Sequence, residues 1–179
     1  GAVGDWISHQ NLQDQPRLAQ QVRVDEGWGT AVETVLGEYL QALCVDGIDD
    51  VSAVLGELEG GTLTLLDQSS AGSISADKGK PMSAVVNASG VDISALIAGV
   101  YVADDLSAAL ALRTQLNASE SVITRDGIWL GANWLRVAKD SDESAGVLER
   151  HQEVERLKEQ IAQLEQSIDE LEQQQASGS

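Results

Sequence analysis

Residues 17–46 read RLAQQVRVDEGWGTAVETVLGEYLQALCVD, and this stretch decides the fold. Proline is favoured at the first position of a helix, so we expect a helix over Pro16–Arg23. A second helix is predicted over Trp28–Leu36, because apolar residues recur there every three or four positions along one side. The apolar run Leu40–Val45 then predicts a short buried strand.

That strand opens a strand–helix–strand unit that occurs twice. In the first copy, Asp49-Asp50 is expected to cap a helix that ends before Gly60-Gly61, and Thr62–Leu66 follows as a strand. The second copy begins at the apolar run Ala98–Ala103. Its helix is expected to start at Asp104-Asp105, and its second strand is predicted over residues 120–124. A cation site is the alternative role for each acidic doublet.

The two copies echo each other locally. LCVDGIDDVSAVLGEL starts at residue 43, and VYVADDLSAALALRTQL starts at residue 100. Two such units predict an α+β fold with two strand–helix–strand subdomains, about 1–67 and about 85–140. Between them, residues 68–84 form the expected linker. Its Ser-, Gly- and Ala-rich part, 68–80, is expected to be mobile, with Lys78 and Lys80 either solvated or contacting an acidic partner.

Short strands are also predicted near the end of the globular part, at 121–125, 128–130 and 134–137. Asp126-Gly127 is typical of a two-residue hairpin turn between the first two of these strands. Short strands with open edges need a partner or a cover.

The last part of the chain, 147–175, carries a heptad pattern with β-branched residues at position a and leucine at position d. We expect a long helix that forms a coiled coil; the alternative is an amphipathic helix packed on its own domain. The expected seam consists of Val154, Leu157, Ile161, Leu164, Ile168 and Leu171.

Composition excludes several classes of protein. Hydrophobic residues make up 42% of the chain, which argues against disorder despite a net charge of -18. One cysteine excludes a disulfide scaffold, and we expect Cys44 to be a core residue. The sequence lacks a phosphate-binding loop and zinc-ligand spacing, and its only histidines are His9 and His151. We therefore expect no catalytic residue, no cofactor and no metal. Neither a membrane span nor a signal peptide is predicted, which favours the cytoplasm.

Three segments of the chain resemble the hinge domain of bacterial SMC (structural maintenance of chromosomes) proteins, in its gammaproteobacterial form. They are residues 17–46, AGVYVADDLSAALAL at 98–112 and SVITRDGIWLGANWLRVAK at 121–139. The resemblance implies a homodimer formed through the hinge, and a helix that begins the returning coiled-coil arm. That arm would pair with the upstream arm of the same full-length chain. ATP-binding heads would lie outside this chain, and the whole complex would entrap or tether DNA at the nucleoid.

The resemblance also marks candidate sites. Many such hinges have paired glycines after the final hairpin, whereas this chain has single glycines beside two tryptophans. The candidate dimer interface is Gly127, Trp129, Gly131 and Trp134. The alternative is that both tryptophans belong to the core.

DNA binding is a competing function, as is a ligand cleft between the subdomains. The candidate DNA contacts are Arg113, Arg125, Arg136 and Lys139. Because the chain is strongly acidic, we expect its own affinity for DNA to be low.

Overall fold

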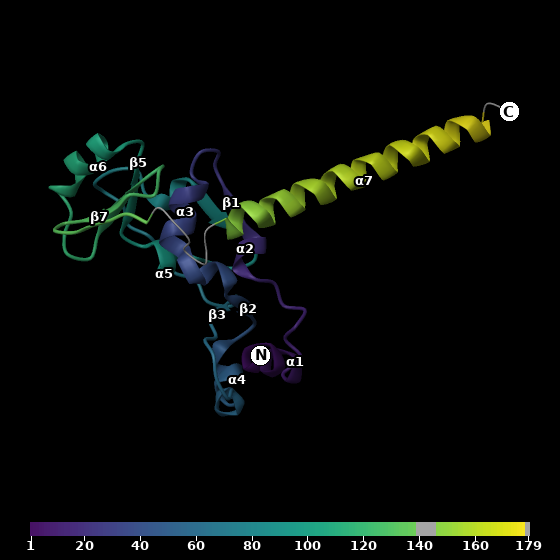
Figure 1. Cartoon of the computed structure of the whole chain (residues 1–179), viewed down its shortest axis with the longest axis horizontal. Helices are drawn as coiled ribbons and strands as arrows, with labels where there is room; N and C mark the ends of the chain where they lie inside the picture. The colour runs from purple at the N-terminus through teal and green to yellow at the C-terminus, as the bar shows by residue number, and fades with distance from the viewer. Residues whose placement is uncertain (139–145, 178–179) are drawn as a thin grey trace.

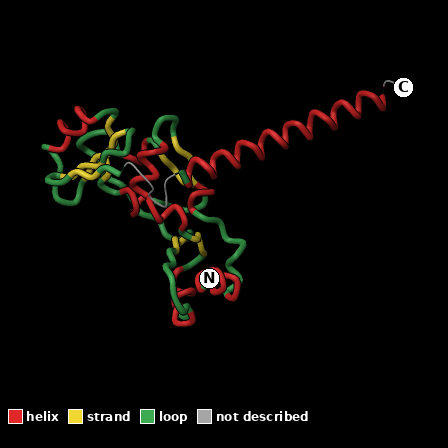
Figure 2. Tube along the Cα trace, in the orientation of Figure 1, coloured by secondary structure: helices red, strands yellow, loops and turns green. Residues whose placement is uncertain are grey.

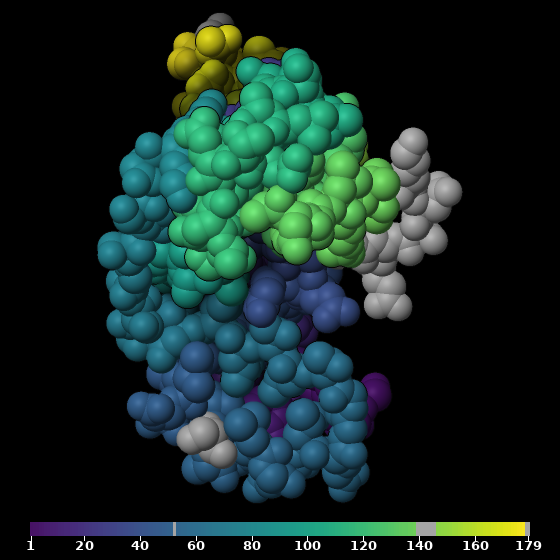
Figure 3. All heavy atoms as spheres, turned by 90° about the vertical axis from the view of Figure 1, so that its left-hand side faces the viewer, coloured from purple at the N-terminus to yellow at the C-terminus, as the bar shows by residue number. Residues whose placement is uncertain are grey.

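The structure is a computed structural model that describes residues 1–138 and 146–177, apart from the side chain of Ser52. A globular body carries a single long helix, α7 (Val147–Ser177), which projects away from it. Figure 2 shows that the body is built from short helices and strands joined by long loops. Turned by 90°, the body has a crescent outline (Figure 3).

Two parallel strand–helix–strand units form the ends of the body, as the repeat predicts. The first consists of β2 (Leu43–Val45), α4 (Ile48–Ser52) and β3 (Leu65–Asp67), and β2 pairs in parallel with β3. In the second, β5 (Val100–Ala103) and β6 (Ser121–Thr124) pair in parallel, and α6 (Leu106–Arg113) connects them.

The second unit continues into a four-stranded sheet of order β5-β6-β7-β8. Its added strands are antiparallel, β7 (Trp129–Gly131) and β8 (Leu135–Arg136). The predicted two-residue turn at Asp126-Gly127 is wrong by one residue. The Thr124 N–H donates to the Ile128 carbonyl (3.0 Å), so three residues form the loop, and Gly127 takes the left-handed conformation there (φ +86°).

Between the two units lies a central layer. It contains α2 (Leu18–Gln21), β1 (Val22–Val24), α3 (Gly29–Leu36), the 3-10 helix η1 (Gly37–Gln41), the 3-10 helix η3 (Met82–Ala84), β4 (Val86–Ala88) and α5 (Ser94–Ile97). The predicted helix over Trp28–Leu36 is confirmed. The helix predicted over Pro16–Arg23 is confirmed only for Leu18–Gln21, because Val22–Val24 is a strand that pairs antiparallel with Val86–Ala88.

Two further elements belong to the first unit. The 3-10 helix η2 (Leu55–Glu57) follows α4, and α1 (Ala2–His9) packs beside them. No helix was expected at the N-terminus. Trp6 anchors α1, because it is buried and its indole N–H donates to the Val54 carbonyl (3.0 Å).

The acidic doublets differ in role. Asp105 caps α6 as predicted, accepting from the Ala108 N–H at 2.8 Å. The predicted cap at Asp49-Asp50 is wrong, because α4 begins before them at Ile48. The cap comes instead from Asp67 at the end of β3, whose carboxylate accepts from the Gly47 N–H (3.2 Å) and the Ile48 N–H (3.0 Å).

Among the described residues, the core comprises three clusters of buried residues. The largest belongs to the central layer and includes Cys44 and the first residues of α7, Val147 and Leu148. Smaller clusters fill the second unit and the first unit. The expectation that Cys44 is a core residue is confirmed, and burial raises the pKa of its thiol.

Candidate functional site

The edge strand β8 of the four-stranded sheet is the candidate contact surface. β8 is paired on one side with β7 and lies last in the sheet order. Large apolar side chains in and beside β8 are exposed: Trp134 (42%), Leu135 (53%) and Val137 (48%). Unpaired strand edges with exposed apolar side chains favour pairing with another chain. We call Trp134–Val137 the β8 edge.

Gly131 has a role inside the chain. A Cβ atom at Gly131 would overlap the indole of Trp134, so the glycine provides the space in which that ring lies. The Trp134 ring meets Trp129 edge to face, with centroids 5.7 Å apart and an interplanar angle of 75°. The single glycine therefore permits an aromatic pair at the sheet edge.

The two tryptophans are not equivalent. Trp129 is half-buried and packs against the central core cluster, and its indole Nε1 is buried with no hydrogen-bond partner in the described part of the chain. Trp134 stays exposed at the rim. The core interpretation thus fits Trp129, and Trp134 remains the candidate for contact with a partner.

Gly127 allows the β6–β7 hairpin to lie close to α3. A Cβ at Gly127 would lie 3.0 Å from Thr34 Oγ1 and 3.1 Å from Thr30 Cγ2. Beside it, the Arg125 guanidinium stacks on the Trp28 ring at 4.2 Å and pairs with Asp104 at 2.9 Å. These contacts hold the hairpin against the start of α3.

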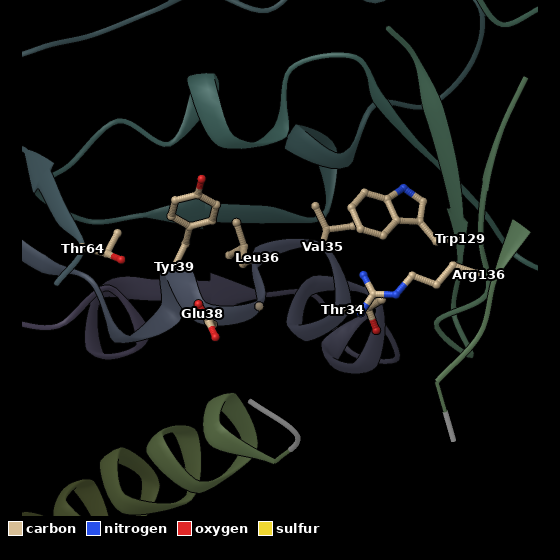
Figure 4. A pocket seen from close by; sticks show the side chains of 9 residues that line it. Thr34, Val35, Leu36, Glu38, Tyr39, Thr64, Trp129 and Arg136 are labelled. Atoms are coloured by element: carbon tan, nitrogen blue, oxygen red, sulfur yellow. The ribbon is translucent and has the colours of Figure 1, made fainter. Parts of the chain in front are cut away.

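A groove of about 410 Å³ runs between α3–η1 and the strands β7 and β8. Figure 4 shows Trp129 and Arg136 at one end of it and Tyr39 and Thr64 toward the other, with Glu38 near Tyr39. Glu38 and Arg136 carry opposite charges, and neither side chain makes a hydrogen bond or ion pair with another residue that the structure describes. Sequence reasoning missed Glu38 and Thr64 as surface residues of this site, because only the fold brings them near β8.

The four candidate DNA contacts do not form one free basic patch. The Arg113 guanidinium donates to the Ala132 carbonyl at 2.8 Å, and Arg125 is held by Trp28 and Asp104. Arg136 lines the groove, and Lys139 lies outside the described residues.

The end of the expected linker is fastened to the second unit. Residues 68–80 contain no helix or strand, but Lys78 pairs with Glu120, and the Asp77 N–H donates to the Tyr101 hydroxyl at 3.3 Å. This pairing raises the pKa of Lys78 and lowers that of Glu120. Neither expectation for Lys78, solvation or an acidic partner molecule, agrees with this internal ion pair.

The seam of α7 is uncovered. Its six seam residues are 47 to 63% exposed, whereas Val147 and Leu148 are buried in the central cluster. A helix packed along its own domain would bury its apolar stripe, so that alternative is wrong beyond the first turn. The uncovered stripe is typical of a helix that lacks its coiled-coil partner.

Two classes of site are absent from the described residues. Within 1–138 and 146–177, no group of three or more His, Cys, Asp and Glu side chains could hold a metal ion. Among these residues, no helix is both long and apolar enough to cross a bilayer.

Comparisons with known proteins agree with the fold. A chromosome partition protein Smc from Coxiella burnetii is 36% identical over 173 residues, which is 96% of this chain and 15% of that protein. The chain thus spans about 15% of the length of such a relative.

Solved structures match as well. An asymmetric dimer of the Geobacillus stearothermophilus SMC hinge domain superposes with a TM-score of 0.63 at 20% identity, covering 92% of this chain and 77% of that one. A Pyrococcus furiosus Smc hinge domain with an extended coiled coil gives 0.56 at 18% identity, covering 90% and 66%. Residues 12–113 match the family described as the flexible hinge domain of SMC proteins. The expected resemblance is confirmed, and the chain belongs to the SMC hinge-domain family.

Proposed function

We propose that this chain is the dimerisation hinge of a chromosome-organising SMC protein. Two copies would join through their globular bodies, so that two coiled-coil arms meet at one end of the complex. The family supports this role, as does the name chromosome partition protein carried by the relative from Coxiella burnetii. In the whole protein, ATPase heads would lie beyond the arms, and the assembly would tether DNA in the cytoplasm at the nucleoid. This chain itself would be no enzyme.

The β8 edge carries the proposal. A partner strand placed along β8 would continue the four-stranded sheet and cover Leu135 and Val137. Trp134 would lie at this contact, since tryptophan is favoured at the centre of interfaces. Gly127, Gly131 and Trp129 would act from within the chain, by shaping the surface that the partner meets.

The groove beside the edge supplies complementary charges. In a two-fold dimer, if residue i of one copy contacts residue j of the other, then j of the first copy also contacts i of the second. An acidic and a basic side chain on the same face can therefore form two equivalent ion pairs across the interface. Glu38 and Arg136 line the same groove. We propose that Arg136 of each copy pairs with Glu38 of the other.

The proposed domain division is into subdomains of about 1–67 and about 85–140. The two parallel strand–helix–strand units, each with its own buried cluster, support it. The arm pairing of residues 147–175 with an upstream segment is part of the same proposal, and the exposed seam supports it.

Sedimentation equilibrium over a concentration series tests the dimer. Leu135→Asp should dissociate it, because the change places a charge at the covered edge. Leu164→Asp is the matched control, since it alters another exposed leucine, in the arm (63% against 53% for Leu135), and should leave the hinge dimer intact. A dimer that is lost with Leu164→Asp and kept with Leu135→Asp would assign association to the arm and refute the proposal.

Charge exchange tests the groove. Glu38→Arg and Arg136→Glu should each weaken the dimer, and the double variant should recover part of the loss. Direct DNA binding by this chain should stay weak, because two of the four candidate contacts, Arg113 and Arg125, are engaged internally and the net charge is -18. Sub-micromolar affinity at ~0.15 M salt would contradict that expectation.

A further inference from the structure

The start of α7 is held by a side chain that is distant in sequence. The carboxylate of Glu33, on α3, accepts from the Gly146 N–H through Oε2 and from the Glu149 N–H through Oε1, both at 3.1 Å. These pairs span 113 and 116 residues of sequence. One carboxylate thus joins the central helix of the body to the beginning of the arm.

The two N–H groups that Glu33 binds belong to the N-cap and to the third residue of α7. The Arg150 N–H donates to the Gly146 carbonyl at 2.9 Å, which makes Gly146 the N-cap of α7 and Glu149 its third residue. A local capping box satisfies these same two N–H groups with two side chains of the helix itself. Here one side chain from another helix satisfies both.

Local capping is unfavourable at this position. Gly146 has φ +77°, a conformation that residues with side chains rarely adopt, and a Cβ there would lie 2.9 Å from an Arg150 guanidinium nitrogen. A serine or aspartate cap would therefore be strained. The glycine leaves the N-cap without a side chain, and Glu33 fills the place such a side chain would take.

The packing around the start of α7 also bears on the direction in which the helix leaves the body. Val147 and Leu148 are buried in the central cluster beside α3 and α2, and beyond them the helix has little cover from the body. The buried anchor of the arm is thus confined to its first turn, and the next turns, as far as Glu159, only line a groove beside α2 and β1. A carboxylate is also favoured at a helix N-terminus by the helix dipole.

We infer that Glu33 is a positioning residue that fixes where the arm helix begins and the direction in which it leaves the body. The inference rests on the proposed function only in taking α7 as the arm. Because both partners of the contact lie in one chain, it holds for monomer and dimer alike.

Hydrogen exchange of single backbone amides in the full chain tests the cap. Glu33→Ala should raise exchange at Gly146 and Glu149 about tenfold, and Glu33→Gln, which keeps one acceptor oxygen, about threefold. Glu26→Gln is the matched control, because Glu26 lines the same cavity at this junction but accepts no hydrogen bond from α7 amides within the part of the chain that the structure describes. Unchanged exchange in Glu33→Ala, an equal rise in Glu26→Gln, or a uniform rise over the whole body would each overturn the inference.

Pulsed EPR distances test the direction of the arm. Spin labels at Ser107→Cys on α6 and Gln163→Cys on α7 report the angle between body and arm, with unlabelled chain in excess so that each labelled chain has an unlabelled partner. Glu33→Ala should broaden the distance distribution, Glu33→Gln should broaden it less, and Glu26→Gln should leave it narrow. Equal distributions in all variants would overturn the inference. Sedimentation of the same samples reports the dimer separately, so failure of the proposed function is recognised independently.

Discussion

The two strand–helix–strand units share a topology but differ in extent. In the first, α4 has five residues, the sheet has two strands, and β3 is half-buried. In the second, α6 has eight residues, the sheet has four strands, and all of β6 is buried. The comparison teaches that the repeated pattern sets parallel pairing, whereas the segment that follows sets the size of the sheet. After β3 comes the loop 68–80, and after β6 comes the hairpin that turns at Gly127.

The largest contrast should appear on truncating one leucine in each unit. Leu130 is buried at 1% exposure, so Leu130→Ala should lower the free energy of unfolding by about 3 kcal/mol. Leu65 is half-buried, and Leu65→Ala should cost about 1 kcal/mol. Urea unfolding of both variants measures the difference. Equal losses would mean that the first unit is packed as tightly as the second.

A glycine substitution tests the antiparallel strands β7 and β8, which only the second unit has. Gly131→Ala should displace the Trp134 indole and lower the free energy of unfolding by about 2 kcal/mol, because the new methyl group overlaps the ring. Combining it with Trp134→Ala should remove most of the conflict, which denaturation of the double variant would reveal. If Gly131→Ala were equally destabilising in the Trp134→Ala background, the indole would not be the cause of the loss. Gly56, with open space around its Cβ position, is the control site for Gly→Ala.

The next largest difference between the two units should come from removing aspartates at the starts of their helices. Asp105→Ala removes the N-cap of α6 and should cost about 1 kcal/mol. Asp50→Ala should change stability by less than about 0.5 kcal/mol, since Asp50 lies inside the first turn of α4 and is exposed. Thermal unfolding of the two single variants compares them. If Asp50→Ala lowered the free energy of unfolding more than Asp105→Ala, Asp50 would be a cap of α4 after all, as the sequence pattern predicts.

Acid titration gives the smallest effect and concerns the cap of the first unit. Hydrogen bonds from the Ser69 hydroxyl and from the Ile48, Ser69 and Gly47 amides lower the pKa of Asp67 to about 2. The stabilisation is therefore complete above the ordinary aspartate pKa of about 3.9 and is lost as pH falls toward 2. Carbon-13 NMR of the carboxyl group should give a midpoint near 2, and exchange at Gly47 and Ile48 should accelerate below it. Asp67→Asn should abolish that pH dependence, and Asp50→Asn should preserve it.

Features with local signals were predictable from the sequence. The helix of residues 29–36, the repeat and the heptad of α7 follow from periodicity within a short window. The predicted helix over Pro16–Arg23 wrongly included Val22 and Arg23, because the strand character of Val22–Val24 comes from pairing with Val86–Ala88, far along the chain. The N-terminal helix was missed for a similar reason, since Trp6 is stabilised by contact with the segment around Val54.

The candidate site divides in the same way. The seam of α7 could be named from heptad spacing, and Trp134 from the resemblance to SMC hinges. The groove could not, because Glu38 and Arg136 come to line it only through the packing of α3–η1 against the sheet. Glu33 likewise has no local signal as a cap, because its two hydrogen-bond donors lie more than a hundred residues away.

α7 is a long helix whose buried anchor lies at one end only. Its 31 residues extend over about 46 Å, yet its buried residues are two at its base, Val147 and Leu148. A tilt of about 10° at that base would swing the far end through roughly 8 Å, by the helix length alone. Displacements of a fraction of an ångström between α3 and Gly146 thus become motions several times larger at the tip, and forces applied at the tip are multiplied on the same few contacts.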